Sequence, residues 1–166
     1  MQNSVSTRSS LLHLTQVAIV ASLYVAVTVL LTPFSFGAGQ IRASEMLNYT
    51  ALYNKRYVVA VTLGVFIANF FSPTAVIDVP VGTIGTLIFL LLSRWLAGYC
   101  SKWWQKYLVM GVLFTVSMFT VAAQLAIVYH MPFWASYPVI MAGEAISMTI
   151  GAFVMPVIAR TVHLDR

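Results

Sequence analysis

The stretch Gln40-Ile41-Arg42-Ala43-Ser44-Glu45 places an amide, a guanidinium and a carboxylate within six residues of a chain that is otherwise almost free of charge. Ionisable groups at membrane depth are unfavourable and therefore mark functional sites. We expect the other polar residues of the outer half to gather around this stretch. Those residues are Asn48, Asn69, Asp78, Gln124 and Glu144. Together they predict a pocket for a small polar solute on the outer side of a membrane.

The composition around this stretch is that of an integral membrane protein. Hydrophobic residues make up 60% of the chain and charged residues 8%, with a mean hydropathy of +0.89. Soluble domains carry about 25% charged residues. The 166 residues leave room for about six spans of ~20 residues and for no soluble catalytic or nucleotide-binding domain. We therefore predict an all-α bundle of six transmembrane helices that forms a single domain over residues 1–166.

The apolar segments predict where these helices lie. The expected spans of ordinary length are Leu11–Leu31, Tyr57–Phe71, Val81–Cys100, Tyr107–Tyr129 and Tyr137–Arg160, with a turn-rich connector at Ser72–Pro80. A further segment, Ala43–Asn54, is helix-like but only about 18 Å long, too short to cross a ~30 Å hydrocarbon core alone.

The distribution of Lys and Arg decides whether the short segment crosses. If it crosses and the N-terminus is inside, eight of the nine basic residues are cytoplasmic and only Arg42 lies outside. Those eight are Arg8, Lys55, Arg56, Arg94, Lys102, Lys106, Arg160 and Arg166. The positive-inside rule therefore favours six crossings with both termini in the cytoplasm. Because these residues are scattered between spans, they do not indicate nucleic-acid binding.

Aromatic residues support the same topology. Trp95, Trp103, Trp104 and Tyr107 fall at the expected inner boundary, and Phe133, Trp134 and Tyr137 fall at the outer one. The single cysteine, Cys100, excludes an intrachain disulfide. Because His13, His130 and His163 lack metal-ligand spacing, we expect no metal site.

Three of the four acidic residues fall in the outer half: Glu45, Asp78 and Glu144. The fourth, Asp165, lies in the C-terminal tail, where solvation explains it. One interpretation is that Glu45 or Glu144 pairs with Arg42 only to hold helices together. Three carboxylates facing one cation nevertheless leave an excess of negative charge, which favours a ligand with hydrogen-bond donors or positive charge.

Amides and aromatics at the same depth have two interpretations each. Asn69 and Gln124 either bind the solute or hydrogen-bond to neighbouring helices. Asn48 would line the same wall from the short segment. Trp134 either stacks on a flat ligand, with Phe36 as a further candidate, or anchors the chain at the membrane interface.

Small residues recur every four positions in two of the expected helices. One stripe comprises Ala18, Ser22 and Ala26, and the other comprises Gly143, Ser147 and Gly151. Such spacing lets another helix approach closely. Internal packing is the usual reason, but in a chain too small to power transport alone one stripe is a candidate docking face for a partner subunit.

The sequence contains no phosphate-cradling Gly-rich loop, no His-Glu-x-x-His and no Gly-x-Ser-x-Gly motif. We therefore expect neither an enzyme nor a cofactor in this chain. Two alternatives remain open: an intramembrane enzyme that uses the outer carboxylates as acid and base, and a carrier that couples protons through Glu144.

The segment Phe36-Gly37-Ala38-Gly39-Gln40-Ile41-Arg42-Ala43-Ser44-Glu45 resembles the Phe-Gly-x-x-Gln-x-Arg-x-Ser-Glu motif of the QueT family. The resemblance continues through Gly64–Pro73, Asp78-Val79, Gly82-Thr83, Thr86-Leu87, Pro132-Phe133-Trp134, Gly143-Glu144 and Gly151. QueT proteins are substrate-binding S-components of energy-coupling factor (ECF) transporters and are associated with queuosine precursors. The resemblance implies the six-helix S-component fold.

The resemblance also implies a substrate, against which the residues can be tested. A queuosine precursor (queuine or its aminomethyl precursor) is a deazaguanine, and the aminomethyl form carries a cationic amine. The guanine edge offers N–H donors to a carboxylate and a carbonyl to an arginine or amide. The outer half supplies the acids Glu45, Asp78 and Glu144 and the donors Gln40, Arg42 and Asn69. Thiamine or another cationic heterocycle fits similar groups and is the alternative substrate.

By the same resemblance, the chain works with a transmembrane scaffold subunit and two cytoplasmic ATPases, which use the ATP. The Ala18–Ser22–Ala26 stripe resembles the motif with which S-components dock on that scaffold. The implied mechanism is capture of the solute outside, tilting of the whole component in the lipid bilayer and release inside. The implied location is the bacterial plasma membrane.

Overall fold

The computed structural model describes residues 2–37, 39–162 and 164, with side chains from Leu11 onward. Over these residues the chain is entirely helical, which confirms the all-α prediction. The expectations for His163, Asp165, Arg166 and the side chain of Arg8 lie outside the described residues.

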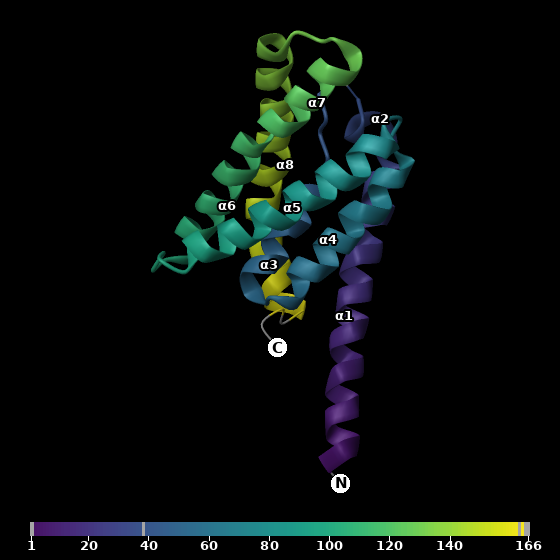
Figure 1. Cartoon of the computed structure of the whole chain (residues 1–166). Coiled ribbons are helices and arrows are strands. Elements are labelled where there is room, and N and C mark those ends of the chain that lie inside the picture. The colour runs from purple at the N-terminus through teal and green to yellow at the C-terminus, as the bar shows by residue number, and fades with distance from the viewer. Residues whose placement is uncertain (1, 38, 163, 165–166) are drawn as a thin grey trace.

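The helices form one elongated bundle (Figure 1). In chain order they are α1 (Gln2–Leu30), α2 (Thr32–Ser35), the 3-10 helix η1 (Ala43–Tyr49), α3 (Thr50–Tyr53), α4 (Arg56–Ala68), the 3-10 helix η2 (Asn69–Phe71), α5 (Ala75–Ala97), α6 (Trp103–Ser117), α7 (Phe119–Tyr129) and α8 (Phe133–Val162). The two chain ends lie at the same end of the bundle, here called the proximal end. The opposite end, with the α1–η1 and α7–α8 connections, is called the distal end.

Four segments of the described chain are long and apolar enough to cross a membrane: Leu11–Leu30, Ala75–Ala97, Trp103–Tyr129 and Phe133–Val162. The structure is therefore that of a multi-pass membrane protein. The segment of α4 and η2, Arg56–Phe71, is apolar but shorter. The remaining predicted span, η1 with α3, is shorter still.

The short segment differs from the expected α-helix because most of it is a 3-10 helix. Its seven 3-10 residues and one α-helical turn reach about 20 Å. This segment packs closely on α8, where a Cβ added at Gly151 would lie 2.7 Å from the Cβ of Met46. The Gly143–Ser147–Gly151 stripe is buried, with Gly151 against this segment and Gly143 against the loop before it, so its small residues serve internal packing.

Several predicted boundaries are wrong. The last helix, α8, starts at Phe133 and not at Tyr137. The connector expected at Ser72–Pro80 already contains the first turns of α5, which begins at Ala75. Asp78 in its first turn accepts a hydrogen bond from Thr74 (2.7 Å). Pro80 lies inside α5, where its missing N–H removes one intrahelical hydrogen bond. The span expected at Tyr107–Tyr129 begins earlier and is interrupted at Met118, where serine and threonine hydroxyls bond to backbone carbonyls.

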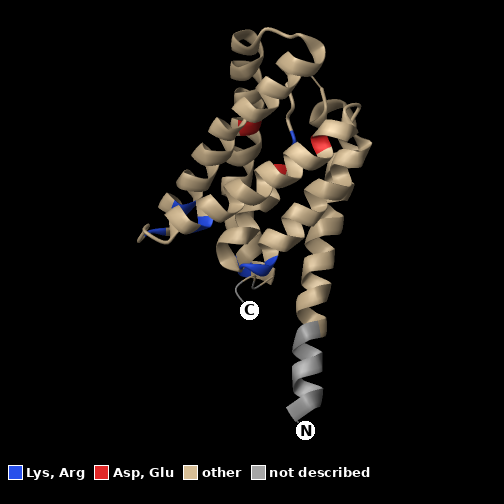
Figure 2. Cartoon of the chain, viewed as in Figure 1, with Lys and Arg blue, Asp and Glu red and all other residues tan. Residues whose placement is uncertain are grey.

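Charge is distributed unequally between the two ends of the bundle. Figure 2 shows Lys and Arg gathered toward the proximal end and Asp and Glu lying farther toward the distal end. Among the described basic residues, Arg42 differs from this pattern: it lies toward the distal end, where it pairs with Glu45. This asymmetry agrees with the sequence-based topology, in which the proximal end is cytoplasmic.

The expected aromatic belts are present in part. Trp95, Trp103 and Trp104 are exposed on the proximal half, as expected of side chains at a membrane interface. Tyr107 is instead buried: its ring stacks on Tyr49 with 4.4 Å between centroids. It belongs to the core, because its side chain points from α6 into the bundle.

Candidate functional site

A small polar pocket lies at the distal end of the bundle. Its volume is about 90 Å³, and its walls come from the α2–η1 connection, η2, α5 and α7. Five of the predicted binding residues line it: Gln40, Arg42, Asn69, Asp78 and Gln124. Residues far apart in the sequence therefore meet here, as the sequence analysis predicted.

Asp78 is the most heavily hydrogen-bonded residue of this pocket. Its carboxylate accepts bonds from Ser72, from Thr74 (2.7 Å) and from the amide of Gln124. The amide of Asn69 donates to the Asp78 carbonyl at 2.9 Å, while its oxygen, Oδ1, is buried and has no hydrogen-bond partner among the described residues. The Asp78 charge is thus solvated by neutral donors and has no cation beside it among these contacts.

Glu45 forms a second group, deeper in the bundle. Only 5% of this residue is exposed, and its two carboxylate oxygens accept hydrogen bonds from Tyr24 (2.6 Å) and Asn48 (2.5 Å). The guanidinium of Arg42 lies 3.6 Å from Glu45, one helical turn away in the sequence. The Glu45 carboxylate therefore has both a cationic partner and two neutral donors.

Arg42 connects the two groups. It lines the pocket, pairs with Glu45 and stacks over the ring of Phe36 at 5.2 Å. An arginine guanidinium does not lose its proton under physiological conditions. The guanidinium stays protonated and supplies positive charge to the distal end.

Glu144 is the third carboxylate, and the described residues leave it without a close partner. It is 1% exposed, and its Oε1 has no hydrogen bond within the described part of the chain. It interacts electrostatically with Glu45 and Arg42, so it belongs to the same distal group. Within the described chain, Glu45 has a cationic partner, Asp78 has neutral donors, and Glu144 is the least compensated of the three carboxylates.

The loop that carries the opening motif is tightly seated on α8. Gly143 leaves no room for a side chain, because a Cβ there would collide with the carbonyl of Gly39. Gln40 has a left-handed backbone with φ 46°, which is unusual for a residue other than glycine. Such conformations gather at ligand clamps and switch regions. The loop beside the pocket is therefore held in a specific shape.

One predicted residue lies elsewhere. Trp134 is 81% exposed, and its ring contacts Phe133 rather than any residue of the distal group. Its role in binding stays a prediction. Tyr137, a further aromatic of the predicted outer belt, donates a hydrogen bond to the Val116 carbonyl and ties α8 to α6.

Three polar residues of the distal group were not singled out from the sequence: Tyr24, Ser72 and Thr74. Tyr24 and Thr28 share one buried face of an otherwise apolar helix, four residues apart, and this pattern could have identified them. Ser72 and Thr74 immediately precede the helix that carries Asp78, where hydroxyl side chains commonly contact the first turn.

The first small-residue stripe has the opposite environment from the second. Ala18, Ser22 and Ala26 are exposed on α1, whose buried face carries Val20, Tyr24 and Thr28. The stripe therefore remains on the outside of the bundle, available to another membrane protein.

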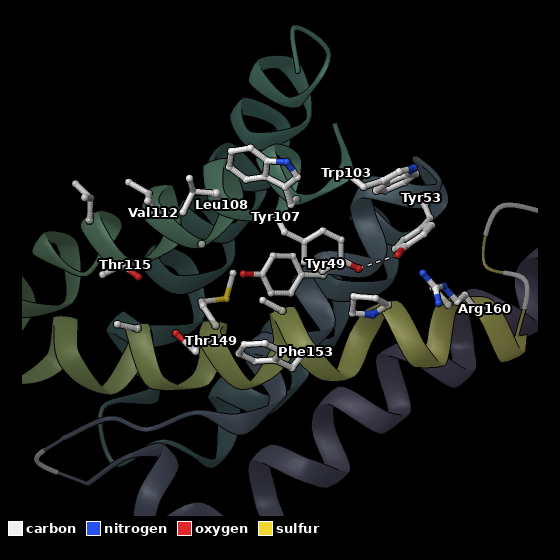
Figure 3. Close-up of a pocket in the computed structure, with 18 residues that line it drawn as sticks. Tyr49, Tyr53, Trp103, Tyr107, Leu108, Val112, Thr115, Thr149, Phe153 and Arg160 are labelled. Carbon is white, nitrogen blue, oxygen red and sulfur yellow. Dashed lines mark hydrogen bonds between the residues drawn. The ribbon is translucent and has the colours of Figure 1, made fainter. Parts of the chain in front are cut away.

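A much larger cavity lies nearer the proximal end, between α6 and α8. This groove has a volume of about 1090 Å³ and is lined mainly by apolar and aromatic side chains (Figure 3). None of the nine predicted solute-binding residues lines it. The polar pocket, at about 90 Å³, is smaller than the ~300–1,000 Å³ typical of small-molecule sites.

Comparison with known proteins is consistent with this distal site. Residues 14–160 match the family model described as the QueT transporter. A relative from Lactococcus lactis subsp. cremoris (strain MG1363), named as a queuosine precursor transporter, is 39% identical over 168 residues, or 96% of this chain and 99% of the relative.

The chain belongs to the QueT transporter family.

This QueT-family chain is accordingly a multi-pass membrane protein of a transporter family. No solved structure matches it significantly. The motif loop, Asp78 and Glu144 all fall within the matched residues.

Proposed function

We propose that this QueT-family chain is the substrate-binding S-component of an ATP-driven ECF importer in a bacterial plasma membrane. Its distal group captures a queuosine precursor from outside, with the aminomethyl-deazaguanine form preferred. The chain itself performs no catalysis. ATP is hydrolysed by two partner ATPases, and the solute is released inside after the whole component tilts.

The observation that carries this proposal is the imbalance of charge at the distal end. Among the described residues of the distal group there are three carboxylates and one cation, Arg42, which pairs with Glu45. Asp78 is bonded to neutral donors, and one oxygen of Glu144 has no hydrogen bond within the described chain. A buried, uncompensated carboxylate is unfavourable unless something neutralises it. An ammonium group on the solute would neutralise Glu144, the carboxylate with an unpartnered oxygen.

The remaining groups suit the ring of the same solute. Arg42 and the amides of Gln40 and Gln124 supply donors for a carbonyl. The Asp78 carboxylate can exchange its hydroxyl and amide partners for the paired N–H donors of a guanine edge. The unpartnered Oδ1 of Asn69 offers a further acceptor.

Six crossings with both termini in the cytoplasm complete the proposal. The proximal position of the basic residues supports this topology. The two short segments, η1 with α3 and α4 with η2, would cross within the bundle, where η1 is covered by α1, α4 and α8. Backbone of irregular geometry is tolerated at membrane depth when protein surrounds it.

Docking on the scaffold subunit is assigned to the exposed stripe of α1. Ser22→Trp is expected to abolish assembly with the scaffold and ATPases, while solute binding by the isolated chain stays intact, because the stripe lies away from the distal group. Ile88→Trp, exposed on a different helix, α5, is the matched control. Co-purification measures assembly, and normal assembly of Ser22→Trp would refute the docking assignment.

Calorimetric titration of the purified chain in detergent tests the solute class. We expect one-to-one binding of aminomethyl-deazaguanine, weaker binding of queuine and guanine, and no binding of thiamine. A response to thiamine alone would retain the S-component architecture and overturn the substrate. Conversion of a solute to product by the isolated chain would overturn the non-catalytic role.

A further inference from the structure

The groove between α6 and α8 is a second cavity, with chemistry unlike that of the distal pocket. Met148 and Tyr107 form a buried floor, and Leu108, Val112 and Phe153 form exposed rims. Figure 3 shows the groove running between the two helices, with Trp103, Tyr53 and Arg160 together at one end and Thr115 and Thr149 toward the other. It is therefore a long channel open along its side.

Small side chains explain why the two helices leave this space. On α8 the groove is lined by alanines at seven-residue intervals, Ala145, Ala152 and Ala159, and on α6 by Gly111. The lined part of α8, from Ala145 to Arg160, is about 22 Å long. One leaflet contributes about 15 Å of hydrocarbon, so the groove is long enough to hold an acyl chain over the depth of one leaflet.

Positive charge marks the proximal end of the groove. Arg160 is exposed and lines it. The ammonium of Lys106 lies 5.0 Å from the ring centre of Trp103, which also lines it. The acidic residues of the described chain, Glu45, Asp78 and Glu144, belong to the distal group, so none of them neutralises this end.

We propose that the groove is a binding site for an anionic phospholipid, with one acyl chain along α6 and α8 and the phosphate at Arg160 and Lys106. Arginine and lysine between membrane helices are suited to anionic head groups, and arginine binds phosphate in a bidentate manner. A transmembrane helix of a partner protein could also fill an apolar groove, but it would not require the positive charge at this end. The site is independent of the proposed solute and lies on other helices than the α1 stripe, so scaffold docking there leaves the groove facing lipid.

Native mass spectrometry of the full chain, released from detergent, tests this site. The probes are phosphatidylglycerol and phosphatidylcholine with identical palmitoyl and oleoyl chains, added at equal concentration. The wild type is expected to retain phosphatidylglycerol at least fivefold more than phosphatidylcholine. Equal retention of the two lipids would overturn the proposal, because the head-group preference rests on the cationic end.

Two sets of variants separate the two parts of the site. Arg160→Gln combined with Lys106→Gln is expected to bring the ratio of the two lipids close to one. Ala152→Trp fills the groove and is expected to abolish retention of both lipids, whereas Val157→Trp, exposed on α8 outside the groove, is expected to behave as wild type. An unchanged lipid ratio in the double variant would overturn the head-group assignment. Wild-type retention in a folded Ala152→Trp would overturn the groove.

Thermal melting and monodispersity of each variant provide the folding control. If Ala152→Trp does not fold, the double variant at the bundle surface still decides the proposal, because neither substitution touches the buried floor of the groove. Solute titration is not needed for any of these outcomes, so failure of the lipid site and failure of the proposed function are distinguishable.

Discussion

The distal pocket and the proximal groove differ in size, lining and charge. The pocket measures about 90 Å³ and is lined by one carboxylate, by amides and by one guanidinium, whereas the groove measures about 1090 Å³ and is mainly apolar with a cationic end. Size alone would assign the solute to the groove. In a membrane, however, lipid chains can fill an apolar groove at no cost, whereas buried carboxylates require a polar or cationic partner. The chemistry of the lining therefore indicates which cavity serves transport.

Glu144→Gln tests the distal charge and is expected to have the largest effect. The substitution retains the shape of the side chain and removes its negative charge. Affinity for aminomethyl-deazaguanine should fall about 100-fold, as when a buried charge pair loses one partner. The melting temperature of the free protein should stay the same or rise, because an uncompensated buried charge is removed. Calorimetry and thermal melting measure both effects, and unchanged affinity would remove Glu144 from the site.

Glu45→Gln is expected to reduce stability more and solute affinity less than Glu144→Gln does. Glu45 is paired with Arg42 and bonded to Tyr24 and Asn48, so its loss leaves a buried guanidinium without its partner. The free energy of unfolding should fall by about 3 kcal/mol, and solute affinity should fall about tenfold. The melting temperatures of Glu45→Gln and Glu144→Gln, each relative to the wild type, measure this difference. If both variants melt at the wild-type temperature, the two carboxylates do not differ in the way that the structure indicates.

Gly143→Ala tests how closely the motif loop is seated. The added methyl group would collide with the Gly39 carbonyl and displace the loop that carries Gln40 and Arg42. Overpacking of this kind costs about 1–3 kcal/mol, so both stability and solute affinity should decrease. Gly85→Ala on α5 is the matched control, because nothing lies within 4 Å of the added atom. Equal behaviour of the two variants in melting and titration would contradict the close seating of the loop.

Ala152→Trp is expected to have the smallest effect on solute binding. Ala152 lines the groove and lies about 12 Å along α8 from Glu144. Substitutions at such separations act nearly independently, so solute affinity should stay within about twofold of wild type. Calorimetric titration with aminomethyl-deazaguanine measures it. A large loss of affinity in a folded variant would mean that the solute occupies the groove.

Much of the distal group could be predicted from sequence because charge is so scarce in this chain. The positive-inside rule placed Asn69, Asp78 and Gln124 at one end of their helices, and the structure brings them into one pocket. The Arg42–Glu45 pair follows from three-residue spacing in a helical segment. The two stripes show the limit of such patterns: both have the same spacing, yet one is buried and the other exposed.

The details that depend on tertiary packing could not be predicted. The short segment adopts a 3-10 helix against α8, and α5 starts at Ala75 because hydroxyl and carboxylate side chains there bond to one another. The sequence also did not reveal that Trp134, at the start of α8, lies on the exposed face of that helix. The groove needs both the small side chains of α8 and the placement of α6 beside them, and the second depends on tertiary packing.

The most direct test of the proposed cation site is a calorimetric titration of the wild-type chain with aminomethyl-deazaguanine and with its 7-cyano analogue. The two solutes share the same ring, but only the first carries a positive charge. We predict one-to-one binding of the aminomethyl form at least tenfold tighter than that of the cyano form, because only the former neutralises Glu144. Equal affinities for the two solutes would contradict that central claim.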